Sequence, residues 1–233
     1  MATSPTLRLL RDELVGFARS RVMIVLWVVL PLLAILGYLL FTSSAEVAAG
    51  MGGDHKMSAN AFMTFLLSSL AGTVAALMVA VDIVSERTRK VYELYVIRPI
   101  RREAIIWAKF LAVAACVVVA CVVAIALGIA VDVARGDPFT AAIAYDALKG
   151  LASLTAVVSL SAAVGTFFGV ISRTILVAVI LVLYVGQNLT IVPMLPMYFG
   201  ILPRQFWVIM AISYALVAVM AWLSAVVFRR SQF

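Results

Sequence analysis

The sequence predicts an all-α integral membrane protein with six transmembrane helices. Hydrophobic residues make up 65% of its 233 residues and charged residues only 12%, whereas a soluble domain carries about 25% charged residues. The apolar residues form six stretches that are each long enough to cross a bilayer, which takes about 20 helical residues. Most charged residues flank these stretches or gather in one internal segment. These three observations exclude a soluble globular protein.

The six predicted spans follow one another in a single transmembrane domain, residues 1–233. They cover residues 22–41, 61–84, 105–131, 148–171, 175–192 and 206–228. Pro31 is expected to kink the first span, because proline removes a helix hydrogen bond. The predicted outer loops, residues 42–60 and 132–147, are too short to fold an extracellular domain.

Residues 4–20, before the first span, are predicted to form an amphipathic helix along the membrane surface. Ser4 and Pro5 are typical of a helix start. Four apolar residues then fall on one helix face at a spacing of three or four, namely Leu7, Leu10, Leu14 and Phe17. The alternative is a simple extension of the first span.

The basic residues predict that both termini are cytoplasmic. The flanks on one side of the predicted bundle carry 14 of the 18 lysines and arginines, and the other side carries Lys56, Arg135, Lys149 and Arg204. Cytoplasmic flanks are the basic ones, so the chain is predicted to cross the plasma or inner membrane with this orientation. The same rule accounts for the net charge of +7 without a nucleic-acid partner.

Residues 85–110 form the one long cytoplasmic connection and hold ten of the 29 charged residues. Residues 86–97 are predicted to form a helix with an apolar arc (Val91, Tyr92, Leu94, Tyr95 and Val96) opposite Arg89, Lys90 and Glu93. Pro99 disfavours helix at Arg98 and forces a turn. This coupling segment, residues 86–100, is suited to mechanical coupling by a partner that moves both flanking spans. A solvated loop that obeys the charge rule is the alternative.

The sequence contains no motif for chemistry of its own. There is no G-x-x-x-x-G-K-[ST] phosphate loop and no G-x-S-x-G elbow. The single histidine, His55, is predicted in an outer loop, which leaves serine catalysis without a base. Asp82 is interpreted as capping charges near Arg87 rather than relaying protons. We therefore predict no catalytic residue, no cofactor bound by this chain and, for Cys116 and Cys121, no disulfide.

Three polar residues near the end of the fifth span, Gln187, Asn188 and Thr190, must face protein or a cavity. They are interpreted either as lining a translocation pathway or as hydrogen-bonding between helices. Residues 193–203 are apolar but contain three prolines and a glycine, which predicts a broken or re-entrant element before the last span.

Three residues of an outer loop, Met51, His55 and Met57, are weak candidates for a soft-metal site. Thioether and imidazole groups suit Cu(I). Methionine is so common in this hydrophobic chain that chance explains the grouping, and no metal is predicted.

Within residues 86–110 the sequence resembles the membrane-spanning permeases of type-2 ABC exporters. Their loop after the second span starts with Glu-Arg, reaches a Pro-[Val/Ile]-x-Arg turn and ends in Gly-Lys-Phe or Gly-Lys-Leu. The matching residues are Glu86, Arg87, Glu93, Leu94, Pro99, Ile100, Arg102, Lys109 and Phe110. Lys90, Val91 and Ala108 depart from the pattern, where the family has Gly, Thr and Gly.

The resemblance implies that two such chains pair, as a homodimer, around a central pathway. Each would bind a separate ATPase subunit, which holds the ATP and Mg²⁺, through the coupling segment. The implied coupling residues are Glu86, Arg87, Arg89, Glu93, Leu94, Arg98, Pro99, Arg101 and Arg102. The implied function is export of a substrate driven by ATP. The alternatives are a stand-alone secondary transporter or channel, and a membrane scaffold for maturation of a copper or other metalloenzyme.

Overall fold

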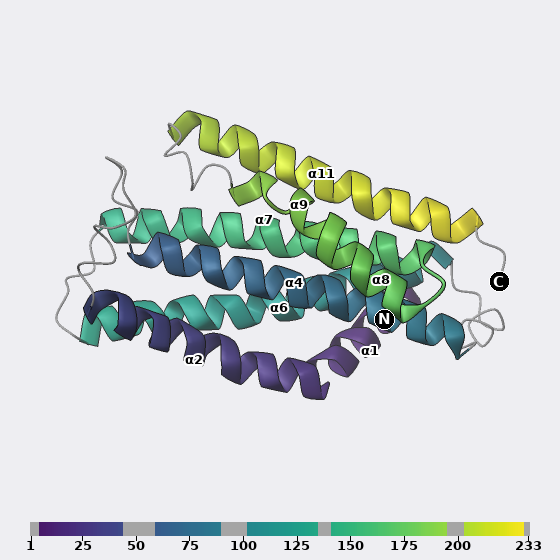
Figure 1. Cartoon of the computed structure of the whole chain (residues 1–233), viewed down its shortest axis with the longest axis horizontal. Helices are drawn as coiled ribbons and strands as arrows, with labels where there is room; N and C mark the ends of the chain where they lie inside the picture. The colour runs from purple at the N-terminus through teal and green to yellow at the C-terminus, as the bar shows by residue number, and fades with distance from the viewer. Residues whose placement is uncertain (1–4, 44–58, 90–101, 135–140, 195–202, 231–233) are drawn as a thin grey trace.

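The computed structural model describes residues 5–43, 59–89, 102–134, 141–194 and 203–230 (Figure 1). These residues form helices and connecting turns, with no strand among them. In chain order the elements are α1 (Pro5–Ala18), α2 (Arg21–Ser43), α4 (Ala59–Thr88), α6 (Arg102–Ala134), α7 (Ala141–Ile171), α8 (Ile175–Leu181), the π-helix η1 (Val182–Gly186), α9 (Gln187–Leu189), the 3-10 turn η2 (Val192–Met194) and α11 (Pro203–Arg230).

The predicted all-helical membrane fold is confirmed. Among the described residues, five segments have the length and hydropathy of membrane spans, namely Leu67–Thr88, Glu103–Leu127, Ala147–Ile171, Ile175–Met194 and Gln205–Arg230. The bent pair Thr6–Ala18 and Arg21–Leu33 would be a sixth if the two helices form one span. The first predicted span lies in α2, a 23-residue helix that continues through Pro31. Several helices run past the predicted bounds, and α7 starts at Ala141 rather than 148. Hydropathy marks the part of a helix that crosses the bilayer, whereas its backbone hydrogen bonds continue beyond it.

The helices lie side by side along the long axis of the molecule (Figure 1). In this view α2 and α11 are on opposite sides, with α4, α6 and α7 between them. The central helices are also the more deeply buried ones. In the membrane-spanning part of α7, 72% is buried inside the protein, whereas only 22% is buried in Ile175–Met194 and in α11. The central helices therefore supply most of the core, and the outer ones leave broad apolar faces exposed.

Two central helices, α4 and α7, approach so closely that their backbones touch. Small residues recur every fourth position on both facing surfaces: Gly72, Ala76 and Ala80 on α4, and Ser161, Gly165 and Gly169 on α7. A Cβ atom added at Gly165 would lie 2.6 Å from the Cα atom of Ala76. Small residues at this spacing let membrane helices associate through van der Waals contact and without a hydrophobic driving force.

The N-terminal helix α1 meets α2 at a bend of 62°. The bend is fixed by Ser20, whose Oγ atom accepts a hydrogen bond from the Met23 backbone N–H at 3.2 Å and so caps α2. The two helices are therefore not one straight helix, and a surface helix and a broken first span both remain compatible with this bend.

The buried face of α1 also differs from the predicted one. Leu9 and Phe17 are buried, whereas Leu7 is 60% exposed. Leu10 and Leu14, predicted on the same face, are partly buried and contact the core. The helix packs along α6, so contacts with protein set its face. That face is centred on Leu9, Glu13 and Phe17, and it does not include Leu7.

Candidate functional site

The structure describes both ends of the predicted coupling segment but not its middle. Glu86 and Arg87 lie on the last turn of α4, Arg89 follows it and is exposed, and Arg102 is the first residue of α6. Because α4 continues to Thr88, Glu86 and Arg87 belong to the helix of the second span and not to the start of a separate coupling helix. Five of the predicted coupling residues lie outside the described residues: Glu93, Leu94, Arg98, Pro99 and Arg101.

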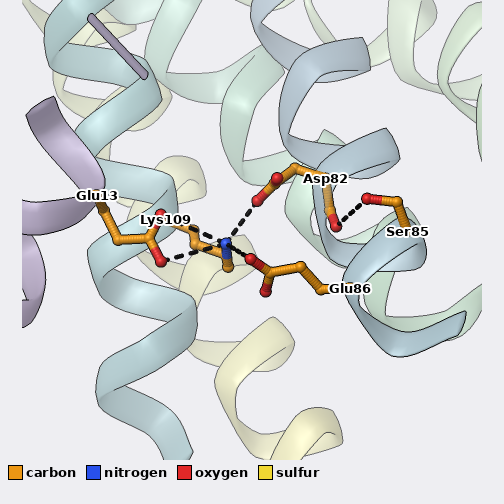
Figure 2. Close-up of polar contacts among 5 residues, drawn as sticks. All are labelled: Glu13, Asp82, Ser85, Glu86 and Lys109. Atoms are coloured by element: carbon orange, nitrogen blue, oxygen red, sulfur yellow. Dashed lines mark hydrogen bonds and ion pairs between the residues drawn. The ribbon is translucent and has the colours of Figure 1, made fainter. Parts of the chain in front are cut away.

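Near these two ends lies a cluster of four charged side chains, Glu13, Asp82, Glu86 and Lys109, which we call the Lys109 cluster (Figure 2). The lysine is buried, and the three carboxylates are partly buried. Lys109 Nζ is 2.6 Å from Asp82 Oδ2, 2.8 Å from Glu86 Oε1 and 3.3 Å from Glu13 Oε1. The lysine side chain is 1% exposed. An ammonium group has three N–H donors, and here each of three carboxylates can accept one.

The cluster joins three helices because of where its members stand in the sequence. Asp82 and Glu86 are one turn apart on α4, so both point to the same side. Glu13 lies one turn from both Leu9 and Phe17 and thus at the centre of the buried face of α1. Lys109 comes from α6, with its Nζ atom 5.9 Å from the centre of the Phe17 ring.

Three carboxylates share one ammonium group, so the cluster has three formal negative charges and one positive charge. Burial raises the pKa of Glu13, an effect that the Lys109 charge opposes and the charges of Glu86 and Asp82 strengthen. Glu13 also makes the longest of the three contacts to Lys109. Because its pKa is raised, Glu13 takes up a proton more readily than a free glutamate.

Sequence reasoning missed this cluster, although a signal was present. Lys109 was expected at the membrane interface as part of the basic flank, and Asp82 was expected near Arg87. The signal was Glu13, a carboxylate in the middle of an apolar stripe, because a buried charge requires a partner. The sequence did not say which lysine or arginine would supply it.

Other polar contacts gather at the same end of the bundle. Arg87 Nη1 donates to the Val170 carbonyl oxygen, 3.1 Å away in the last turn of α7. Arg229, near the end of α11, forms an exposed ion pair of 3.2 Å with Glu103 at the start of α6. We call this the basic end, and its cationic residues include Arg8, Arg11, Arg19, Arg21, Arg87, Arg89, Arg102, Lys109, Arg173, Arg229 and Arg230.

The three polar residues of the fifth span differ in burial and in hydrogen-bond partner. Gln187 Nε2 donates to Thr73 Oγ1 on α4 at 2.7 Å. Asn188 is exposed and donates to the Tyr184 carbonyl oxygen at 2.6 Å, and Thr190 is buried and donates to the Gln187 carbonyl oxygen at 2.8 Å. The π-helix Val182–Gly186 directly precedes them. Gln187 thus makes the hydrogen bond between helices that was one of the two interpretations, and pathway lining stays a prediction.

The Gln187–Thr73 bond can be measured by a double-mutant cycle. We expect Gln187→Leu and Thr73→Val to be non-additive in unfolding free energy by about 0.5–1.5 kcal/mol, the range for hydrogen bonds between membrane helices. The measurement is unfolding in mixed detergent. Asn188→Leu paired with Thr73→Val is the control and should be additive, because the Asn188 amide bonds within its own helix. Additivity of the first pair would contradict the contact.

The weak metal candidates, Met51, His55 and Met57, lie outside the described residues. Within the described ranges, no group of three or more His, Cys, Asp or Glu side chains is arranged to hold a metal ion. The three carboxylates of the Lys109 cluster instead bind the lysine ammonium. The predicted broken element, residues 193–203, is described only as far as the turn Val192–Met194 and from Pro203 onward.

Comparison with protein families finds a match to the family described as ABC-2 family transporter protein over residues 49–227. The matched range includes both helices that flank the coupling segment, and three of the four residues of the Lys109 cluster. Glu13 and the rest of α1 lie outside it. The comparison with curated protein sequences found no match.

Proposed function

The chain belongs to the ABC-2 family of transporter proteins, and we propose that it is the permease subunit of an ATP-driven exporter. In this proposal a separate ATPase subunit binds the coupling segment and hydrolyses ATP with Mg²⁺. The permease pairs with a second copy of itself and moves substrate outward across the cell membrane. No catalytic group of the permease takes part in hydrolysis.

One observation carries the proposal: the helices on both sides of the coupling segment are joined to each other near the ends that lead into it. Lys109, on the second turn of α6, binds Asp82 and Glu86 on the last two turns of α4. Arg87 also ties the end of α4 to the end of α7. A partner that moves the end of α4 would therefore also move α6 and α7, as coupling to a separate ATPase requires.

The basic end supports the proposed orientation. Helix α1 and the C-terminal end of α11 both lie there, beside the start of α6 (Figure 1). The coupling segment joins α4 and α6 at this end too. Since basic flanks are retained in the cytoplasm, the coupling segment and both termini would face the compartment in which ATP is hydrolysed.

The outer face of the fifth span supports the proposed pairing. The segment Ile175–Met194 is among the least buried of the spans, and Tyr184 is 75% exposed on it. Asn188, also exposed, makes one hydrogen bond within its own helix. The rest of its amide would face lipid, which is unfavourable unless a protein surface covers it. A second copy of the chain, packed along this face, would provide that cover.

Purification tests the proposal. The protein should be extracted from its source membrane in mild detergent and assayed for a co-purifying soluble subunit and for ATP hydrolysis. We expect an ATPase subunit to remain bound and to hydrolyse ATP. If no ATPase remains bound and none restores hydrolysis when added, the chain is not the permease of an ATP-driven exporter.

The proposed grip of the coupling segment is tested by Glu93→Arg combined with Arg101→Glu. We expect this double change to abolish ATPase co-purification, because it reverses charges on the segment that the partner binds. Membrane insertion and folding should be unaffected, since neither residue lies in a predicted span. Elution as a monodisperse peak measures folding. Undiminished co-purification of the ATPase would show that these residues do not bind it.

A further inference from the structure

The Lys109 cluster contains one carboxylate more than is needed to join α4 to α6. Two carboxylates of α4 already bind the lysine at 2.6 and 2.8 Å. A third carboxylate, Glu13, reaches the same ammonium from α1, which lies outside the residues matched to the family. One buried cation thus connects an N-terminal helix to both flanks of the coupling segment (Figure 2).

Helix α1 makes both polar and apolar contacts besides Glu13. The Cys116 thiol donates a weak hydrogen bond of 3.9 Å to the Leu14 carbonyl oxygen. Leu9 and Phe17 are buried by apolar contacts on either side of Glu13. Apolar contacts of this kind are non-directional and allow a helix to slide or roll. A charge-assisted hydrogen bond to a buried ammonium is directional, so it fixes the position of α1 along α6.

We propose that Lys109 is a positioning residue of ATP-driven transport, which holds α1 to the ends of α4 and α6 so that the three helices move together when the ATPase acts. The inference rests on the proposed function. It assigns to Glu13 the role of attaching α1, and to Asp82 and Glu86 the role of joining the two flanks of the coupling segment. Lys109 is the shared centre of both connections.

One substitution removes the contact of Lys109 with α1 and keeps its contacts with α4. Glu13→Ala removes the α1 contact and leaves Lys109 with Asp82 and Glu86, so α4 and α6 stay joined. Asp12→Ala is the matched control, because it removes a carboxylate from the neighbouring position of the same helix, where the side chain is exposed. The two variants have equal net charge, and each replaces one carboxylate of α1 by alanine.

The test is hydrogen–deuterium exchange on the whole complex with its ATPase, in lipid nanodiscs, with and without Mg-ATP. In the unmodified complex we expect ATP to change exchange at the end of α4 and in α1 together. In Glu13→Ala the change at the end of α4 should persist, while that in α1 falls at least fivefold. Asp12→Ala should behave as the unmodified complex does. A general loss of stability would alter exchange both in α1 and at the end of α4. A change confined to α1 therefore identifies a positioning role.

The outcomes separate the inference from the function on which it rests. If ATP changes α1 in Glu13→Ala as much as in Asp12→Ala, the inference is wrong and the proposed function stands. If the unmodified chain binds no ATPase, the proposed function fails and the inference falls with it. A third readout needs no ATPase: in the permease alone, Glu13→Ala should speed exchange in residues 5–18 about tenfold. Unchanged exchange there would also overturn the inference.

Discussion

Lys109→Met is expected to lower the free energy of unfolding by about 3–5 kcal/mol, the usual cost of removing one partner from a buried ion pair. Methionine fills most of the space of the lysine stem but leaves Asp82, Glu86 and Glu13 facing one another without a cation. Their mutual repulsion and their lost hydrogen bonds then act in a site from which water is largely excluded. The measurement is the unfolding midpoint of the detergent-solubilised protein in a denaturant series.

An exposed ion pair on the same helix is the control for this change. Glu103→Gln breaks the contact to Arg229, whose side chain is 62% exposed, and should cost no more than about 1 kcal/mol. A combined variant with Lys109→Met, Asp82→Asn, Glu86→Gln and Glu13→Gln should recover most of the stability lost in Lys109→Met, because no charge remains buried without a partner. Equal costs for Lys109→Met and Glu103→Gln would contradict the burial of the cluster.

The spans were predictable because the ability to cross a bilayer depends on the length and hydropathy of one continuous segment. The same holds for the helix start at Pro5 and for the placement of most basic residues on one side. The exact face of α1 was not predictable in this way. Leu7 and Leu9 are equally apolar, and only the docking of α1 on α6 decides that Leu9 is buried.

The Lys109 cluster could not be predicted from any single segment of the sequence. Its members come from positions 13, 82, 86 and 109, and their meeting requires three helices to pack in a particular order. Charge rules assign Lys109 to the basic flank whether it is buried or exposed, because they count residues and ignore their neighbours. For the same reason the π-helix before Gln187 was missed, since Val182–Gly186 reads as ordinary apolar span.

The contact between α4 and α7 was likewise only partly visible in the sequence. Glycine and alanine are common in membrane helices, so their spacing on α4 or α7 alone does not name a partner. The pattern is informative when both helices are known to face each other, because each small residue then lies opposite another. The sequence alone therefore does not identify which pair of spans packs closely.

Gly165→Leu is expected to have an effect of similar size, lowering the free energy of unfolding by about 3 kcal/mol or more, at the top of the range for overpacked cores. A Cβ atom at this position would lie 2.6 Å from the Ala76 Cα atom and closer still to the Ala76 carbonyl oxygen. Backbone atoms cannot rotate away as a side chain can. Therefore α4 and α7 would have to separate along their whole contact, and the contacts at Gly72 and Gly169 would be lost with it.

Two comparisons make this prediction specific to the backbone contact. Gly16→Leu inserts the same side chain at a glycine of α1, where an added Cβ atom would meet no neighbouring atom within 4 Å. This variant should leave the thermal midpoint in detergent unchanged or slightly raised, because leucine favours helix more than glycine does. Ala76→Gly should not rescue Gly165→Leu, since the obstructing atoms belong to the backbone that glycine shares. Rescue by Ala76→Gly would mean that side chains, and not backbones, set the distance between α4 and α7. The distance between the two helices would then be adjustable, and the α4–α7 contact would not be rigid.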